Sequence, residues 1–212
     1  MRTAIVLCAS IACLLLPGTP ALAADSPADV LKNANKLIEK QMDKKVEEGG
    51  DAEKKRDEKI KKIVDDFLDF NAIAKKALGK YWAERTDEEK DEFNKLFKEL
   101  MQKNYLKTIK EKKDYVIAYD SEVIDEDDKD KAVVTTTVTA KSQEGEEAET
   151  TMVYKLHKVK KKWLVYDIET DEVSLVSNYK SSFGKIIKEK GYAELVTKIR
   201  KKIDAGSDGS TI

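Results

Sequence analysis

The chain has 212 residues, and its 40 Lys and Arg nearly balance 41 Asp and Glu, giving a formal net charge of −1. Because the two signs are interspersed, the sequence lacks the basic footprint of a nucleic-acid-binding protein, and no nucleic-acid partner is expected. The length fits one domain with a substantial hydrophobic core.

The first 23 residues have the pattern of a cleavable signal peptide. Arg2 supplies a basic start, an apolar run covers residues 4–16, and Ala21-Leu22-Ala23 matches a small-x-small cleavage site. The apolar run is shorter than the roughly 20 residues that span a bilayer. We therefore expect a soluble periplasmic protein, exported by this peptide. A lipoprotein acylated at Cys13 is the alternative.

Removal of this peptide also removes both cysteines, Cys8 and Cys13. The mature chain then has no thiol for a disulfide, a metal site or a nucleophile, so its stability must come from packing. We expect it to form one α+β domain over residues 24–204, followed by a disordered tail over 205–212.

Helical spacing of apolar residues predicts two helices near the start of this domain. Ser26-Pro27 is a good beginning for the first, because serine caps a helix and proline suits its first position. Its apolar stripe runs to Met42 and is broken at Gly49-Gly50. A narrower stripe over residues 60–67 predicts a second helix on the surface.

Two further helices are predicted before the middle of the chain. The dense apolar pattern over residues 70–82 indicates a deeply packed helix, for which Asp69 is a possible cap. Thr86 and Glu89 form a capping box, and the stripe that follows predicts a long helix ending near Lys110.

From Tyr115 the apolar period changes to two, which predicts strands. Four are expected, at residues 115–124, 131–141, 149–158 and 163–169, and their short links favour an antiparallel meander. Helical spacing then returns as far as residue 203. The predicted fold is therefore α+β: a curved four-stranded antiparallel sheet with helices packed on one face, placed both before and after the sheet.

Residues that could carry chemistry are few. His157 is the sole histidine, and a half-exposed structural role is the simplest interpretation. The acidic run over 125–130 lacks the ligand pattern of an EF-hand and reads as a solvated hairpin tip. The three lysines at 160–162 suit a solvated turn, although an anionic lipid surface is an alternative. No catalytic residue, metal site or cofactor is expected.

Several short motifs, in order, resemble the MlaC-type family, the periplasmic phospholipid-binding proteins also called toluene-tolerance auxiliary proteins. The resemblance covers roughly residues 65–203. It rests on Asp69-Phe70, Leu78-Gly79-Lys80-Tyr81-Trp82, Thr86-Asp87-Glu88-Glu89 leading to Phe93 and Leu96-Phe97, Tyr105, Trp163-Leu164-Val165-Tyr166-Asp167, and Val173-Ser174-Leu175-Val176-Ser177-Asn178-Tyr179 with Phe183. The chain departs from the family at Glu172, where glycine is usual, at Lys180, where arginine is usual, and at Ser182, where glutamine is common.

The resemblance implies a phospholipid carrier whose acyl chains lie between helices and sheet. It also implies partners: an inner-membrane ABC transporter complex with a lipid-binding ring protein, and an outer-membrane lipoprotein complex. Apolar residues that would face a curved sheet are the candidate lining of such a cavity. They are Trp82, Phe93, Phe97, Leu100 and Tyr105 from the helices, Val134, Val138, Tyr154, Leu156 and Val165 from the sheet, and Leu175, Tyr179 and Phe183 from the end of the fold.

Two other functions remain open from the sequence. An enzyme on a similar cone-shaped scaffold would need a pocket carboxylate and a tyrosine, but Tyr166 and Asp167 are neighbours in a strand and should point to opposite faces. A periplasmic adaptor or chaperone would instead have a solid core and bind proteins through its surface helices. A cavity of lipid size distinguishes the carrier from the adaptor.

Overall fold

The computed structural model describes residues 26–111, 115–141 and 147–206. The predicted signal peptide and residues 207–212 of the predicted tail lie outside these ranges. The described helices before the sheet are α1 (Pro27–Met42), α2 (Asp51–Phe67), α3 (Phe70–Leu78), the 3-10 helix η1 (Gly79–Trp82) and α4 (Asp87–Glu111). After the sheet come α5 (Leu175–Lys190) and α6 (Tyr192–Asp204).

The predicted helix starts are confirmed by their capping contacts. The Asp29 backbone N–H donates to Ser26 Oγ over 3.2 Å, and the Asp29 carboxylate accepts from the Ser26 N–H. At α4 the Glu89 N–H donates to Thr86 Oγ1 over 3.2 Å, and the Thr86 N–H donates to the Glu89 carboxylate over 3.0 Å. Each box satisfies backbone donors that a helix start leaves unpaired.

The strands form one antiparallel meander in the order β1-β2-β3-β4-β5. Their bounds are β1 (Tyr115–Ile124), β2 (Lys131–Lys141), β3 (Glu147–Val159), β4 (Lys162–Thr170) and β5 (Val173–Ser174). The expected number of strands, four, is corrected to five, because a two-residue turn after β4 lets Val173–Ser174 pair back onto it. A strand of two residues is too short to show the alternation of apolar and polar residues from which strands are predicted.

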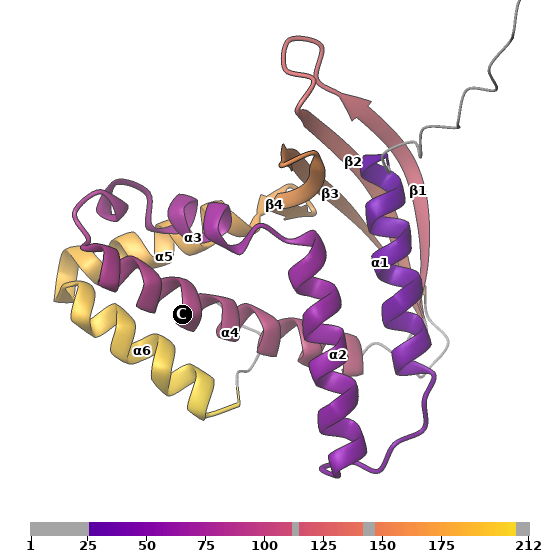
Figure 1. The fold of residues 1–212 in the computed structure, drawn as a ribbon, viewed down its shortest axis with the longest axis horizontal. Coiled ribbons are helices and arrows are strands. Elements are labelled where there is room, and N and C mark those ends of the chain that lie inside the picture. Colours follow the sequence, from indigo (N-terminus) through magenta and orange to yellow (C-terminus); the bar gives the residue numbers. More distant parts are fainter. Residues whose placement is uncertain (1–25, 112–114, 142–146, 207–212) are drawn as a thin grey trace, which may run out of the picture.

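Irregularities in the strand register bend the sheet. The β1–β2 register shifts between Tyr119 and Ser121, and the β3–β4 register shifts beside Lys155. An extra residue in one strand bends it and increases its twist. Figure 1 shows the result: β1 to β3 curve away from the helices α3 to α6, while α1 stands alongside the strands.

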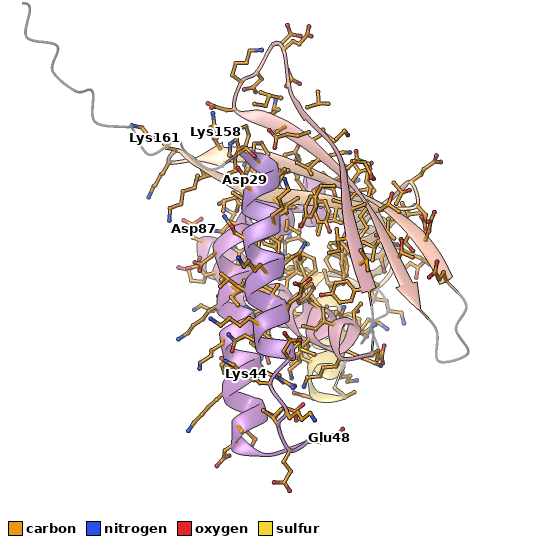
Figure 2. All side chains as sticks on the ribbon, turned by 90° about the vertical axis from the view of Figure 1, so that its right-hand side faces the viewer. Asp29, Lys44, Glu48, Asp87, Lys158 and Lys161 are labelled. Atoms are coloured by element: carbon orange, nitrogen blue, oxygen red, sulfur yellow. The ribbon has the colours of Figure 1, made fainter. Side chains whose placement is uncertain are left out.

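The helices α1 and α2 pack against each other and form the layer beside the sheet. Figure 2 shows them side by side, with the curved strands to one side of both. At the start of α1, Glu122 from β1 accepts hydrogen bonds from the Ser26 hydroxyl and the Ala28 N–H, at 2.9 and 2.8 Å. A carboxylate is favourable there because the start of a helix carries partial positive charge. In the described residues, no helix is long and apolar enough to cross a membrane.

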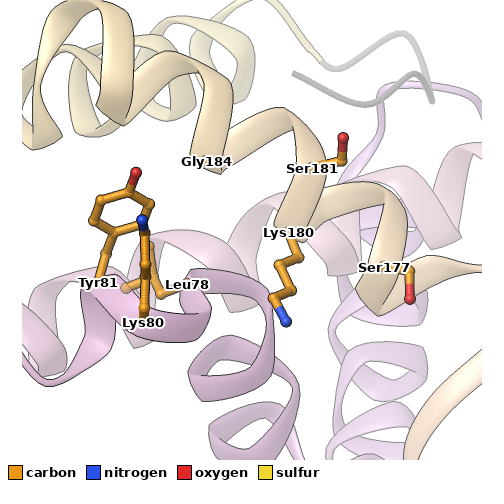
Figure 3. Close-up of a pocket in the computed structure, with 7 residues that line it drawn as sticks. All are labelled: Leu78, Lys80, Tyr81, Ser177, Lys180, Ser181 and Gly184. Atoms are coloured by element: carbon orange, nitrogen blue, oxygen red, sulfur yellow. The ribbon is translucent and has the colours of Figure 1, made fainter.

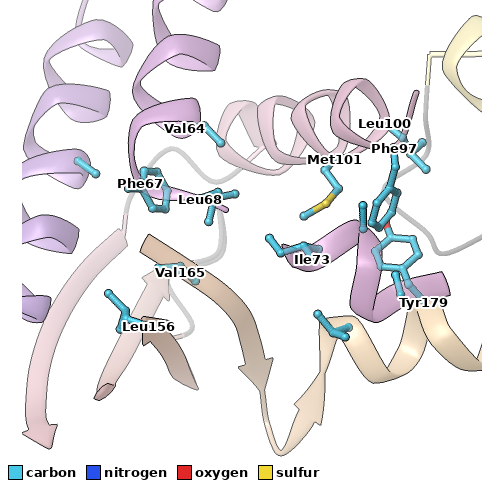
Figure 4. Packing of buried hydrophobic residues seen from close by; sticks show 14 of the residues in the cluster. Val64, Phe67, Leu68, Ile73, Phe97, Leu100, Met101, Leu156, Val165 and Tyr179 are labelled. Carbon is cyan, nitrogen blue, oxygen red and sulfur yellow. The ribbon is translucent and has the colours of Figure 1, made fainter. Parts of the chain in front are cut away.

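The core is continuous from the helices to the sheet. Figure 4 shows its middle, where Val64, Phe67 and Leu68 from α2 and the segment after it face Leu156 and Val165. Leu68 also forms a parallel bridge to Val165, and the Asp69 N–H donates to the Val165 carbonyl over 2.8 Å. The junction between α2 and α3 is therefore fixed to the edge of β4.

The turn between β4 and β5 carries strain at Glu172. Its φ of 68° lies in the left-handed region, which costs a non-glycine residue about 1–2 kcal/mol. Glu172→Gly should stabilise the protein by roughly 0.5 kcal/mol after the entropy cost of glycine, raising the Tm by about 1–2 °C in a calorimetric scan. Glu172→Ala is the control: it removes the same charge but keeps the Cβ, so an equal gain there would contradict the strain explanation.

Candidate functional site

Some of the candidate lining residues form an aromatic cluster within the helical half of the protein. The rings of Phe97 and Tyr179 meet edge to face with centroids 4.8 Å apart, and both contact Phe183 with centroids 5.3 Å away. Phe93 lies 5.5 Å from Phe97. These are separations at which aromatic rings attract one another, and Leu100 beside them is fully buried. The side chains of this group therefore pack against one another.

A second group lies where the sheet meets α2. Val134, Leu156 and Val165 have no solvent-accessible surface and belong to the packed core. Trp82, at the end of η1, and Leu175, at the start of α5, are partly buried and pack against the hydrophobic core. The structure therefore does not bring all the candidate lining residues to one place.

The third group lies near the end of α4 and on the inner face of β2 and β3. Burial raises the pKa of Tyr154 to about 12, and burial also raises the pKa of Tyr105. Both side chains nevertheless keep accessible surface, as does Val138 at 9%. Tyr105 and Tyr154 pack against the core and are covered only in part. This region is therefore half-open, in contrast to the two packed groups.

The half-open region is also lined by tyrosines of β1 that the sequence did not single out. Tyr115 and Tyr119 are half-buried, and burial raises the pKa of each. Tyr115 is near Tyr105 and Tyr154, since its charge contributes to their raised pKa values. Alternation along β1 could have found this pair, because Tyr115 and Tyr119 lie on the same inner face as Ile117, opposite Val138.

Helix α1 closes one side of this region through polar contacts. The Asn35 side-chain amide donates to the Tyr119 hydroxyl over 2.7 Å, and Lys32 Nζ lies 5.3 Å from the centre of the Tyr119 ring. The buried Thr136 hydroxyl lies near the Tyr154 hydroxyl but has no hydrogen-bond geometry with it. The region is thus apolar in its walls and has a few hydroxyl groups, an arrangement typical of sites for amphipathic ligands.

His157 has a structural partner, as a half-exposed residue in a strand often does. Its Nε2 lies 2.9 Å from Asp69 Oδ2, and its ring packs against Tyr166 with centroids 5.0 Å apart. Asp69 Oδ1 accepts the Ala72 N–H over 2.9 Å, which confirms Asp69 as the cap of α3. The pair therefore ties β3 to the start of a helix. No three His, Cys, Asp or Glu side chains in the described ranges gather as a metal site.

Asp69→Ala should lower the free energy of unfolding by about 1 kcal/mol, because it removes the cap of α3. Asp69→Asn keeps an oxygen that can accept the Ala72 N–H, so its loss in a urea titration should be smaller. If both variants lose the same stability, the carboxylate contact with His157 outweighs the cap and the assignment fails.

Hollows lined by described residues lie away from the half-open region. One, of about 540 Å³, lies between η1 and α5 (Figure 3), and the other, of about 480 Å³, lies between α2 and the end of α4. Neither hollow is lined by a candidate lining residue. In the second, Lys110 donates hydrogen bonds to Glu53 and Asp57, and this contact lowers the pKa of Glu53 to about 2.

The fold and the site together define an α+β protein in which helices before and after a curved meander leave a half-open, apolar region against its inner face. The sequence model of the MlaC protein matches residues 32–201. The chain therefore belongs to the MlaC family, as the resemblance of its motifs indicated.

Solved structures agree with this assignment. Seven chains match, among them a phospholipid-binding protein from Ralstonia solanacearum, solved in complex with a phospholipid. That protein is 25% identical in sequence and superposes with a TM-score of 0.67, over 86% of this chain and 99% of its own. No curated protein matches the chain by sequence.

Proposed function

We propose that this protein binds a phospholipid and holds its acyl chains in the half-open region between α1, the end of α4 and the inner face of β1 to β3. The observation that carries the proposal is the partial exposure of Tyr105 and Tyr154, two tyrosines that burial nevertheless affects, beside the buried Val138. The solved relative with a bound phospholipid supports it.

The hydrophobic effect is sufficient for such binding. Each buried methylene contributes about 0.8 kcal/mol, so an acyl chain of around 16 carbons gains on the order of 12 kcal/mol on leaving water. A bilayer is as apolar as the site, so exchange with a membrane is nearly neutral in free energy. No catalytic step is needed, and we propose that the protein is not an enzyme.

The proposed role is that of a periplasmic carrier, which would take lipid between membranes. The signal-peptide pattern and the membership of the MlaC family support this role. Its proposed partners are an inner-membrane ABC transporter complex with a ring protein and an outer-membrane lipoprotein complex. A transfer assay tests this role. The purified protein should accelerate the movement of a fluorescent phospholipid from donor vesicles to acceptor vesicles.

Native mass spectrometry tests the binding itself. The purified mature protein should carry an added mass equal to that of a phospholipid, which organic extraction should release and thin-layer chromatography should identify. A protein without lipid, even after incubation with phospholipid vesicles, would favour the adaptor with a solid core.

A further inference from the structure

The groove between η1 and α5 has the features of an anion site. Leu78, Lys80 and Tyr81 line it on one side, and Ser177, Lys180 and Gly184 line it on the other (Figure 3). Its volume of about 540 Å³ falls within the range of ligand pockets, about 300–1,000 Å³. The two lysines come from segments about 100 residues apart in the sequence.

The charge of this groove is unbalanced. None of its lining residues is acidic, and within the described part of the chain neither Lys80 nor Lys180 forms an ion pair. The groove between α2 and α4 is different, because there Lys110 pairs with Asp57 and Lys61 with Glu58. Two lysines therefore line a hollow that has no acidic lining residue, and this arrangement favours an anion.

Both lysines are exposed, and packing holds the stem of Lys180. Gly79 has a φ of 55°, and a Cβ there would lie 2.9 Å from Lys180 Cε, so the stem of Lys180 rests directly on the backbone of residue 79. Lys80 Nζ lies 5.2 Å from the centre of the Tyr81 ring. Ser177 belongs to the first turn of α5, where the Val176 N–H donates to Asp167 and the Ser177 N–H donates to Ser174 Oγ, so the groove side offers the Ser177 hydroxyl and not the helix start.

We propose that this groove binds the phosphate of a phospholipid head group at an anionic membrane surface. Lysine is a compact cation that suits phosphate, serine hydroxyls add donors, and the groove is larger than a phosphate ion needs. It shares no residue with the proposed acyl-chain region, and α5, which lines it, lies across the fold from β1 (Figure 1). The groove therefore binds a lipid of the membrane and not the lipid that the protein carries.

The test compares vesicle binding of two matched double variants of the mature protein. Lys80→Gln with Lys180→Gln removes the two groove charges, and Lys185→Gln with Lys188→Gln removes two exposed charges from the same helix, α5. Sedimentation with vesicles of phosphatidylglycerol and phosphatidylcholine at low salt should show about 30-fold weaker binding for the groove variant alone, the factor that two charges represent. Vesicles of phosphatidylcholine alone should bind neither the wild type nor the variants.

Three results would overturn the proposal. Equal weakening of both variants would mean that net charge alone drives binding, and binding unchanged in the groove variant would exclude the groove. Saturable binding of inorganic phosphate without vesicle binding would assign the groove to the free ion. Circular dichroism checks that the variants fold. Extracted phospholipid should stay unchanged in the groove variant, so failure here is distinguishable from failure of the carrier proposal.

Discussion

Val138→Trp should abolish most of the phospholipid binding proposed for this protein and leave the fold intact. Val138 is on the inner face of β2, opposite Ile117, and lies in the half-open region with Tyr105 and Tyr154. An indole placed there would occupy the space proposed for acyl chains. Because the proposal has acyl chains and not protein fill that space, the free energy of unfolding should change by less than about 1 kcal/mol.

Two tryptophan variants serve as controls for Val138→Trp. Val116 on the outer face of β1 is 68% exposed, so Val116→Trp should retain its lipid. Val134, on the same strand and face as Val138, is fully buried, so Val134→Trp should overpack the core and cost about 1–3 kcal/mol. Lipid extraction and urea titration measure the two effects. If Val138→Trp destabilises as strongly as Val134→Trp, the region is solid and the proposed site is wrong.

Phe183→Ala should lower the free energy of unfolding by about 3–5 kcal/mol. Phe183 is fully buried and contacts Phe93, Phe97 and Tyr179, so its removal leaves a cavity that its neighbours can refill only in part. Urea denaturation would measure the loss as a lower midpoint concentration, with the dependence of the unfolding free energy on urea concentration unchanged. A loss of this size would show that the aromatic cluster is structural core. Whether it is also a wall of the lipid site is decided by the lipid content of the same variant.

Lipid content separates the two roles of Phe183. At a temperature where Phe183→Ala is folded, it should carry as much phospholipid as the wild type. Val173→Ala, at a position that is 59% exposed, is the stability control and should change the free energy of unfolding by less than about 0.5 kcal/mol. A variant that is stable but lacks lipid would place the aromatic cluster in the acyl-chain wall.

Local patterns predicted the elements of the fold because their causes are local. Ser26, Asp69 and Thr86 are caps in the structure, since a capping residue acts on backbone groups within three positions. The change of period at Tyr115 likewise marks the first strand. The two residues of β5 escaped prediction, because their pairing depends on the turn at Asp171 and Glu172 rather than on a repeating pattern.

The candidate site was predicted less completely, for a physical reason. Apolar periodicity shows which face of an element avoids water, and it does not show what lies against that face. Phe97 and Tyr105 share one helix and both read as inward-facing, yet one contacts other rings and the other borders a half-open region. The meeting of Lys80 with Lys180 depends on the packing of η1 against α5, which no spacing along the chain encodes.

The aromatic cluster and the half-open region occupy different parts of the fold, and this separation has a consequence for the range of cargo. The rings of Phe93, Phe97 and Phe183 contact one another and make the helical half of the protein rigid. The tyrosines near Val138 take no part in those contacts. We expect guests of different length or unsaturation to be accommodated without disturbing the rigid part. If the protein binds phospholipid as proposed, its tolerance of different acyl chains and its thermal stability can then vary independently.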